Sequence, residues 1–349
     1  MYIKWLDGIK GLGSIAVLLC HYNMMFTTPE WFASGVVAKW LMSGGYAVAL
    51  FIVISGFSAW LSVGRKIGDR KAIGKLVINR YLRFAVPFGI VFTILYVLWF
   101  LGSFNYHSQA GEISGSKALA TAFWPIGISG FFKALLLSPV GADFWDAPLW
   151  MMKYIFLSTY IALILRFATE GKRRFITMLI LIVTSMFFAF WDVFFWGVML
   201  GIVLGYFFQS YGIKLHTIQK SIAGGVIFLL AIIARYHLPA SIEAINFTSA
   251  ALLLISFHFL PFIQRILEYR VLQYLGKISL GVYLWHWPVL CSMTSFVFVK
   301  THNMSPAESF FITTAVTFLT ILLVAHLSHK FIETRVSSYI IKRISNYIR

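Results

Sequence analysis

The stretch KGLGSIAVLLCHYN, Lys10–Asn23, places a cation and a histidine at the two ends of an apolar run. An α-helix turns about 100° and rises about 1.5 Å per residue, so Lys10 and His21 share one face, about 16 Å apart. With Lys10 at a membrane boundary, His21 lies near the middle of the bilayer, where an ionisable group is costly and indicates function. The alternative is a neutral histidine bonded between helices and a lysine that reaches the surface.

Similar apolar runs recur along the whole chain. Of its 349 residues, 60% are hydrophobic and 12% are charged, against roughly 45–50% and ~25% in soluble domains. We therefore predict an all-α integral membrane protein with about ten transmembrane helices. The runs lie near 9–27, 41–62, 84–102, 148–166, 174–190, 192–209, 221–236, 244–263, 278–297 and 308–328. Only Trp191-Asp192 separates the fifth run from the sixth, so these two could form one broken helix.

The positive charges fall mainly on one side of this predicted topology. With a cytoplasmic N-terminus, 23 of the 29 Lys and Arg residues lie inside and five lie outside, and Lys153 falls within the fourth run. Cationic loops mark the cytoplasmic side, so both termini are predicted there, and the net charge of +17 needs no nucleic acid partner. We predict a transmembrane domain over 1–335 and a basic amphipathic tail over 336–349 that meets anionic lipid. The first helix is expected to be retained, and the loop 103–147 could be re-entrant or interfacial.

The two cysteines, Cys20 and Cys291, both fall inside apolar runs. A thiol in such surroundings behaves as a small hydrophobe. We therefore expect no disulfide and no metal site.

Several motifs follow one another in a recognisable order. They are LDGIKGLGSIAVLLCH (Leu6–His21), LFIVISGF (Leu50–Phe57), NRYLRFAVP (Asn79–Pro87), PLWMMKYIFLSTY (Pro148–Tyr160), LGKISLGVYLWHWPV (Leu275–Val289) and FIETR (Phe331–Arg335). In order and spacing this set resembles the membrane-bound acyltransferase-3 family. Members mostly have Arg where this chain has Lys10, many have paired glutamates where it has Lys153, and a proline often stands at Thr334. No esterase-like domain is expected after the last helix.

The resemblance implies transfer of an acyl group, usually acetyl from acetyl-coenzyme A, to a sugar hydroxyl. His21 is the candidate general base, because histidine titrates near the working pH. Ser55, or backbone amides near Ser55-Gly56, could bind the oxyanion. Ser55, Cys20 and Ser279 could each be proposed as a nucleophile. Lys10 is counted among the catalytic residues.

Coenzyme A carries phosphates, which favour clusters of arginine and lysine. The densest cluster lies in GRKIGDRKAIGKLVINRYLR, Gly64–Arg83. Its first cations, Lys75 among them, either bind the donor or form an ordinary cytoplasmic loop. Arg80 and Arg83 match a family motif at the mouth of the third predicted helix, so we expect them, with Lys10, to bind the donor.

Other polar residues are candidates for substrate binding: Lys153, Trp150, Tyr283 and His286. Each also has a structural alternative. Trp150 could anchor the helix at the interface, His286 could pack beside Pro288, and Lys153 is costly unless it faces a polar cavity. His286 lies deep enough in its helix to meet His21. Asp7 is expected to cap the first helix and to pair with Lys10.

The sequence thus predicts an O-acetyltransferase of the bacterial inner membrane. Its acceptor is expected to be a lipid-linked or polymeric envelope saccharide, first of all lipopolysaccharide O-antigen. A small molecule or another glycan is also possible as acceptor. The rival class is a glycan or lipid flippase, which predicts inverted repeats and helices broken near the midplane.

Overall fold

The computed structural model of the chain describes residues 3–33, 42–120, 128–137, 139, 147–210, 217–237 and 241–347, and every element in these ranges is helical. Nine of the helices there are long and apolar enough to cross a membrane. This confirms the prediction of an all-α integral membrane protein. The first predicted run also forms a helix, α1 (Trp5–Met25), but its polar residues keep it outside these nine.

The remaining elements follow in chain order. Those of the first half are α2 (Glu30–Ala33), α4 (Gly44–Gly64), α5 (Arg70–Phe100), α6 (His107–Ser114), α7 (Lys117–Ala120), α8 (Ile128–Leu137), the 3₁₀-helix η2 (Ala147–Met151) and α9 (Met152–Thr169). Those of the second half are α10 (Arg174–Trp191), α11 (Val193–Ser210), α12 (Thr217–His237), α13 (Ile242–Phe259), α14 (Pro261–Leu267), α15 (Arg270–Val289), the π-helix η3 (Leu290–Thr294), α16 (Ser295–Thr301), α17 (Pro306–Leu327), the π-helix η4 (Ser328–Ser337) and α18 (Ser338–Tyr347).

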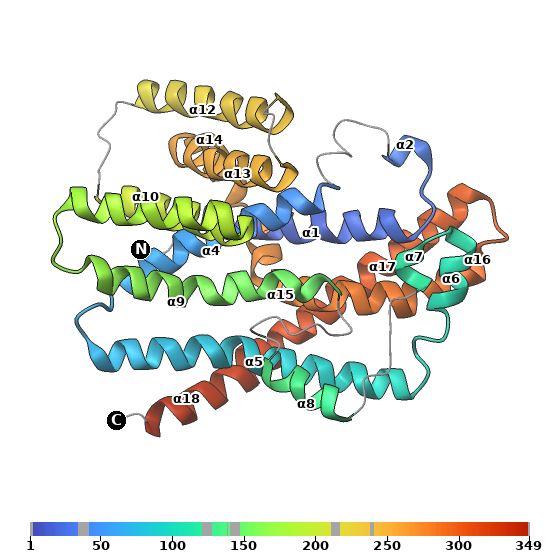
Figure 1. The fold of residues 1–349 in the computed structure, drawn as a ribbon. Helices are drawn as coiled ribbons and strands as arrows, with labels where there is room; N and C mark the ends of the chain where they lie inside the picture. The colour runs from blue at the N-terminus through green and yellow to red at the C-terminus, as the bar shows by residue number, and fades with distance from the viewer. Residues whose placement is uncertain are drawn as a thin grey trace.

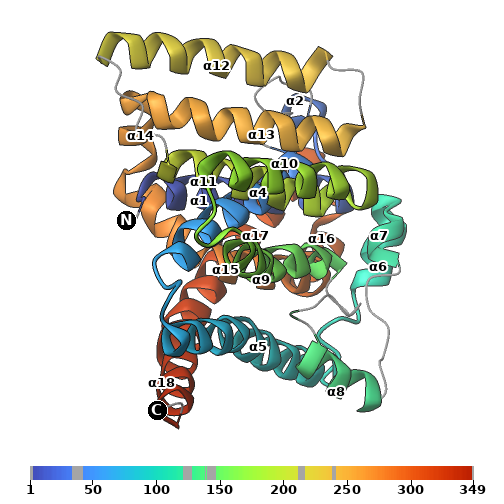
Figure 2. The ribbon, with the colours of Figure 1, turned by 60° about the vertical axis from the view of Figure 1, so that its left-hand side comes forward.

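The long helices lie roughly alongside one another in one bundle (Figure 1). Both chain ends lie at the same end of this bundle, and the short helices α2, α6 and α7 lie at the other. In both views α12 forms one edge, and α5 lies at the opposite edge together with α8 and α18 (Figure 2). An even number of crossings between the termini agrees with this arrangement.

The fifth and sixth runs are two separate helices, α10 and α11, that pack against each other. Asp192 between them caps the start of α11, because its Oδ1 accepts a hydrogen bond from the Phe194 amide at 2.8 Å. A carboxylate at this position satisfies a free helix amide and meets the positive end of the helix dipole. The Trp191-Asp192 pair between the two apolar runs therefore forms the turn of a helical hairpin.

Helix α5 begins fourteen residues before the predicted run at 84–102. Asp69 caps it by accepting a hydrogen bond from the Ala72 amide at 3.0 Å, and the helix continues through Pro87 to Phe100. The prediction that Arg80 and Arg83 lie at the mouth of a helix is thus wrong. Arg80 lies ten residues inside α5, about 15 Å from its first residue, because the charged segment has a cap and good helix formers.

The predicted loop 103–147 and the tail are partly helical. Within the loop the structure describes α6, α7 and α8, whereas 121–127, 138 and 140–146 lie outside the described residues. The tail forms α18, which contacts α5 and η4, and its last two residues lie outside the described ranges. Whether the loop re-enters the membrane, and whether α18 meets lipid, stay predictions.

Glycines allow the closest helix contacts in the bundle. A Cβ added at Gly201 of α11 would collide with the Val53 carbonyl oxygen of α4, and one added at Gly56 of α4 would collide with the Val198 carbonyl oxygen. A Cβ added at Gly11 of α1 would lie 2.8 Å from the Gly276 amide nitrogen of α15. Small residues at such crossings let helix backbones approach in a membrane, where apolar contact alone does not favour association.

Replacing Gly201 by alanine should therefore destabilise the protein, although alanine is the better helix former. The steric cost of such overpacking is on the order of 1–3 kcal/mol. The matched control is Gly225→Ala in α12, where an added Cβ meets no atom within 4 Å. Thermal unfolding of the two purified variants in detergent is the measurement. Gly225→Ala should match or slightly exceed the unsubstituted protein, and equal melting of both variants would contradict the assigned α4–α11 contact.

Candidate functional site

Two adjoining cavities lie near the end of the bundle that carries the termini. The deep chamber has a volume of about 360 Å³ and the wide chamber one of about 830 Å³. Their walls share Lys10, Arg80, Arg83, Thr159 and Ser279. A ligand in the wide chamber could therefore extend into the deep one without leaving the cationic wall.

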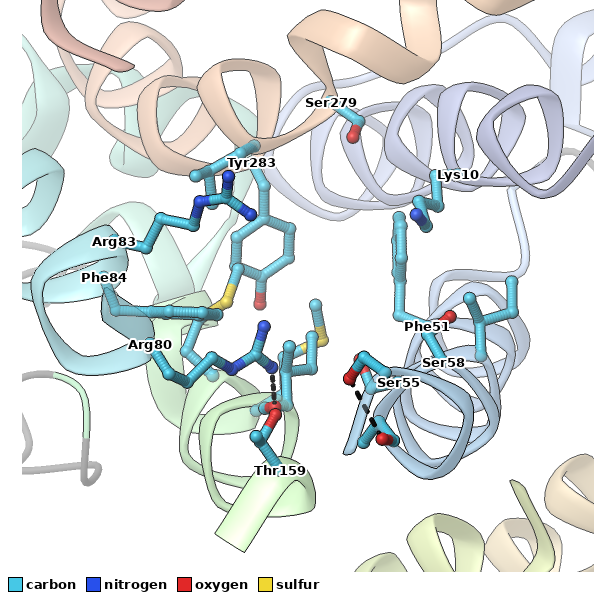
Figure 3. A pocket seen from close by; sticks show the side chains of 17 residues that line it. Lys10, Phe51, Ser55, Ser58, Arg80, Arg83, Phe84, Thr159, Ser279 and Tyr283 are labelled. Carbon is cyan, nitrogen blue, oxygen red and sulfur yellow. Dashed lines mark hydrogen bonds between the residues drawn. The ribbon is translucent and has the colours of Figure 1, made fainter. Parts of the chain in front are cut away.

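Five α-helices and the end of η2 surround the deep chamber. Figure 3 shows Lys10, Ser55, Arg80, Thr159 and Tyr283 turned toward the same space from α1, α4, α5, α9 and α15 respectively. On α4 the hydroxyl side chains at positions 55, 58 and 62 all line it. This spacing of three and four places the hydroxyls on one face of a helix. It is the sequence signal that could have predicted the other two serines, which the motif search missed.

The cations of the shared wall differ in how they are held. Arg80 donates a hydrogen bond to the Ile155 carbonyl of α9 and lies over the Phe84 ring, 4.7 Å from its centroid. Lys10 pairs with Asp7 at 3.1 Å, which confirms that predicted contact. Asp7 lies in the first turn of α1, after the N-cap residue Lys4, so the prediction that it caps the helix is wrong.

Arg83 is the freest of these cations. Its side chain lines both chambers and is exposed, and it forms no hydrogen bond or ion pair with any residue the structure describes. An unpaired guanidinium offers several donors to an anion. It is therefore the residue best suited to contact a charged ligand here.

The wall of the wide chamber contains further charged side chains. Lys66, Lys277 and Lys342 line it, together with His329 and Glu333, which form an ion pair at 3.1 Å in η4. Lys75, predicted to bind the donor, lies on α5 but lines neither chamber. The excess of cations makes this cavity suitable for a ligand with phosphate groups.

The two candidate histidines meet in the structure. His21 Nδ1 and His286 Nε2 lie 3.0 Å apart, and the rings stack with centroids 5.1 Å apart. His286 is only 1% exposed, and its Nδ1 lies 2.8 Å from the Tyr283 carbonyl oxygen. The Trp287 ring packs edge-on against His21 at 5.4 Å. Residues 265 positions apart in the sequence thus form one hydrogen-bonded unit.

Tyr283 connects this histidine pair with the deep chamber. Its side chain lines the chamber, and its ring centroid lies 5.5 Å from that of His286. Its hydroxyl donates a hydrogen bond to the Pro148 carbonyl oxygen. His21 itself is partly exposed and lines neither chamber.

Ser55 lies in the middle of α4, away from His21. A Cβ added at Gly44, the first residue of α4, would lie 2.9 Å from the sulfur of Cys20, the neighbour of His21. Ser55 lies eleven residues further along α4, about 16 Å along the axis. The structure places Ser55 with Lys10, and the two predicted catalytic residues His21 and Ser55 do not meet.

Lys153 and Trp150 line neither chamber. Lys153 Nζ lies over the Tyr154 ring at 4.8 Å, and Trp150, which is 41% exposed, packs edge-on against Phe194 at 4.8 Å. Lys153 thus forms a cation–π pair, and Trp150 belongs to an aromatic cluster. A role of these two residues in substrate binding stays a prediction.

Comparison with known proteins gives the site a chemical class. Residues 3–326 match a family model described as an acyltransferase domain. A peptidoglycan O-acetyltransferase, OatA of Listeria monocytogenes, is 21% identical over 371 residues, which cover 95% of this chain and 55% of that protein. The chain thus spans about half the length of this relative. No solved structure matches. The family match covers most of the chain and favours the acyltransferase over the flippase, and the chain accordingly belongs to the acyltransferase-3 family.

Proposed function

We propose that the protein is an O-acetyltransferase that moves an acetyl group from acetyl-coenzyme A to a sugar hydroxyl of a bacterial cell-envelope glycan. The single observation that carries this proposal is the position of Tyr283. It forms the wall of the cationic deep chamber on one side and contacts the His286–His21 pair on the other. A binding site for a phosphorylated donor and a candidate base are thus joined through one side chain.

The donor's nucleotide end suits the wide chamber. Its phosphates would meet Arg83, Lys10 and Lys66, which line that cavity. The pantetheine arm would extend into the deep chamber, where Ser55 and Ser58 offer hydroxyls. In the orientation that the Lys and Arg distribution predicts, this end of the bundle faces the cytoplasm, where acetyl-coenzyme A is made.

His21 would act as general base for an alcohol, which is a weak nucleophile at neutral pH. As the sugar oxygen attacks the thioester carbonyl, its proton passes to His21. The C–S bond of the tetrahedral intermediate then breaks, and the coenzyme A thiolate leaves and takes up a proton. This direct transfer requires no nucleophilic residue of the protein.

An envelope saccharide is supported as the acceptor by the hydroxyl groups that such a saccharide offers and by the name of the Listeria relative. The name of the Listeria protein describes O-acetylation of peptidoglycan, an envelope polysaccharide. A polymeric or lipid-linked envelope saccharide offers the same kind of hydroxyl. Lipopolysaccharide O-antigen is our first candidate, and the enzyme would then act in the inner membrane.

His21→Ala should abolish acetyl transfer. A general base contributes about 10²- to 10⁴-fold to a rate, so a loss of at least about 100-fold is expected. The measurement is mass spectrometry of envelope polysaccharide from cells that express the intact or the substituted protein. His258→Ala is the control, because this histidine packs on Phe208 in another part of the bundle. Normal acetylation by the His21 variant would contradict its role as base.

Arg83→Ala should weaken donor binding more than it slows chemistry. A hydrogen bond to a charged group contributes about 1.5–3 kcal/mol, so KM for acetyl-coenzyme A should rise by roughly 10- to 100-fold. Steady-state kinetics with the purified protein and a fixed acceptor give KM and kcat separately. Arg173→Ala, on the exposed connection before α10, is the matched control. An unchanged KM would place the donor outside the wide chamber.

A further inference from the structure

The contacts of His286 determine which nitrogen of His21 is free to accept a proton. His286 Nδ1 lies 2.8 Å from the Tyr283 carbonyl oxygen, and its Nε2 lies 3.0 Å from His21 Nδ1. A carbonyl oxygen only accepts hydrogen bonds, so His286 Nδ1 must be the donor in the first contact. In a neutral imidazole the other nitrogen then carries a lone pair, and His286 Nε2 must accept.

The same reasoning continues to His21. Because His286 Nε2 accepts, the proton between the two rings belongs to His21 Nδ1. The second nitrogen of the neutral His21 ring, Nε2, then carries the lone pair. Through two successive hydrogen bonds, the backbone carbonyl of Tyr283 therefore determines which ring nitrogen of His21 carries the proton.

We propose that His286 is a positioning residue that holds His21 in the tautomer with Nδ1 protonated, so that Nε2 is the base. This inference rests on the proposed function of His21. Histidine tautomers in proteins are set by the hydrogen bond of the second nitrogen. Here His286 Nε2 accepts that hydrogen bond, and the Tyr283 carbonyl fixes the tautomer of His286.

The surroundings of His286 keep this arrangement rigid. Its ring is 1% exposed and lies between the rings of His21 and Tyr283. The hydroxyl of Tyr283 is bonded to the Pro148 carbonyl, which fixes that side chain in turn. None of the three rings of Tyr283, His286 and His21 can rotate without breaking a contact with its neighbour.

The arrangement also serves the proposed step. When the acceptor hydroxyl gives its proton to His21 Nε2, the ring becomes an imidazolium that donates from both nitrogens. Nδ1–H stays bonded to His286 Nε2, so the new charge meets a lone pair rather than an apolar wall. The proton on Nε2 then returns to the departing thiolate, and both rings regain their starting protonation.

Nuclear magnetic resonance of the protein labelled with ¹⁵N-histidine tests the tautomer without any turnover. Two-bond correlations between ring protons and nitrogens identify the protonated nitrogen, and the spectrum of His21→Gln assigns the His21 signals. We expect Nδ1 protonated in the unsubstituted protein. In His286→Phe, which preserves a ring but removes the acceptor, His21 should shift toward the Nε2-protonated form that predominates for a free side chain in water. His21 protonated on Nε2 in the unsubstituted protein would overturn the proposal.

Kinetics of acetyl transfer provide the second readout. His286→Phe should lower kcat by ~10- to 100-fold, part of what a general base contributes, and change KM for the donor by less than about threefold. His286→Gln should retain more activity, because its amide oxygen can occupy the position of Nε2 and accept from His21. His302→Phe is the control: its Nδ1 also lies close to the carbonyl three residues earlier, that of Val299 at 2.7 Å, but it lies at the far end of α16.

The outcomes separate this inference from the function on which it rests. If His21→Ala is inactive but His286→Phe has an unchanged kcat, the positioning role is wrong and the proposed function stands. If the unsubstituted protein transfers no acetyl group from acetyl-coenzyme A, the proposed function fails, and the resonance experiment still decides the tautomer. A low kcat in His286→Phe with an unaltered His21 tautomer would also overturn the proposal.

Discussion

The site depends on the close contact between α1 and α15. Gly11 and Gly276 form this contact, and a Cβ added at either of them would meet backbone atoms of the other helix at or below 2.8 Å. The two helices advance in the same direction, so their start places Lys10 near Ser279 and their later turns place His21 against His286. Glycine brings the backbones near enough for short polar side chains to bridge them.

Two half-buried arginines show how the fold accommodates charge among apolar helices. Arg166 lies over the Trp60 ring at 3.7 Å and donates to the Trp60 carbonyl at 3.2 Å. Arg235 bonds Asn246 at 2.8 Å and Ser43 at 2.6 Å, with its guanidinium 4.2 Å from the Tyr46 centroid. Each of these guanidinium groups donates hydrogen bonds to protein acceptors and has its charge over an aromatic face. Arg83 has no such partners among the described residues and faces a cavity, which distinguishes a ligand contact from a structural one.

The chemistry proposed for this chain is divided along one helix. Lys10, in the first part of α1, lines the two cationic chambers. His21 lies about 16 Å further along the axis of the same helix. A donor with charge at one end and a reactive thioester at the end of a long arm fits such a separation. On α15, Tyr283 lines the deep chamber and His286 follows one turn later, with Pro288 and the π-helix η3 directly after them. A proline lacks the amide for the regular helix bond, so the local irregularity lies beside the histidine pair.

The sequence by itself determined the membrane class, the positions of most helices and the shared face of Lys10 and His21. These are local properties, because hydrophobicity along a run and the 3.6-residue period need no knowledge of distant residues. It also predicted the Asp7–Lys10 pair, which is one helical turn apart. It failed at the start of α5, where a capped, charged segment continues a helix that hydrophobicity alone would begin later.

Only the tertiary structure decided which of these residues meet. It joined His21 to His286, gathered Arg83 with Lys10 and Ser279 around one cavity, and separated Ser55 from His21 and Lys153 from the chambers. Such contacts depend on which helices cross and at what height. Glycines and shape complementarity between helices far apart in the chain set those crossings, and no periodicity within one helix encodes them.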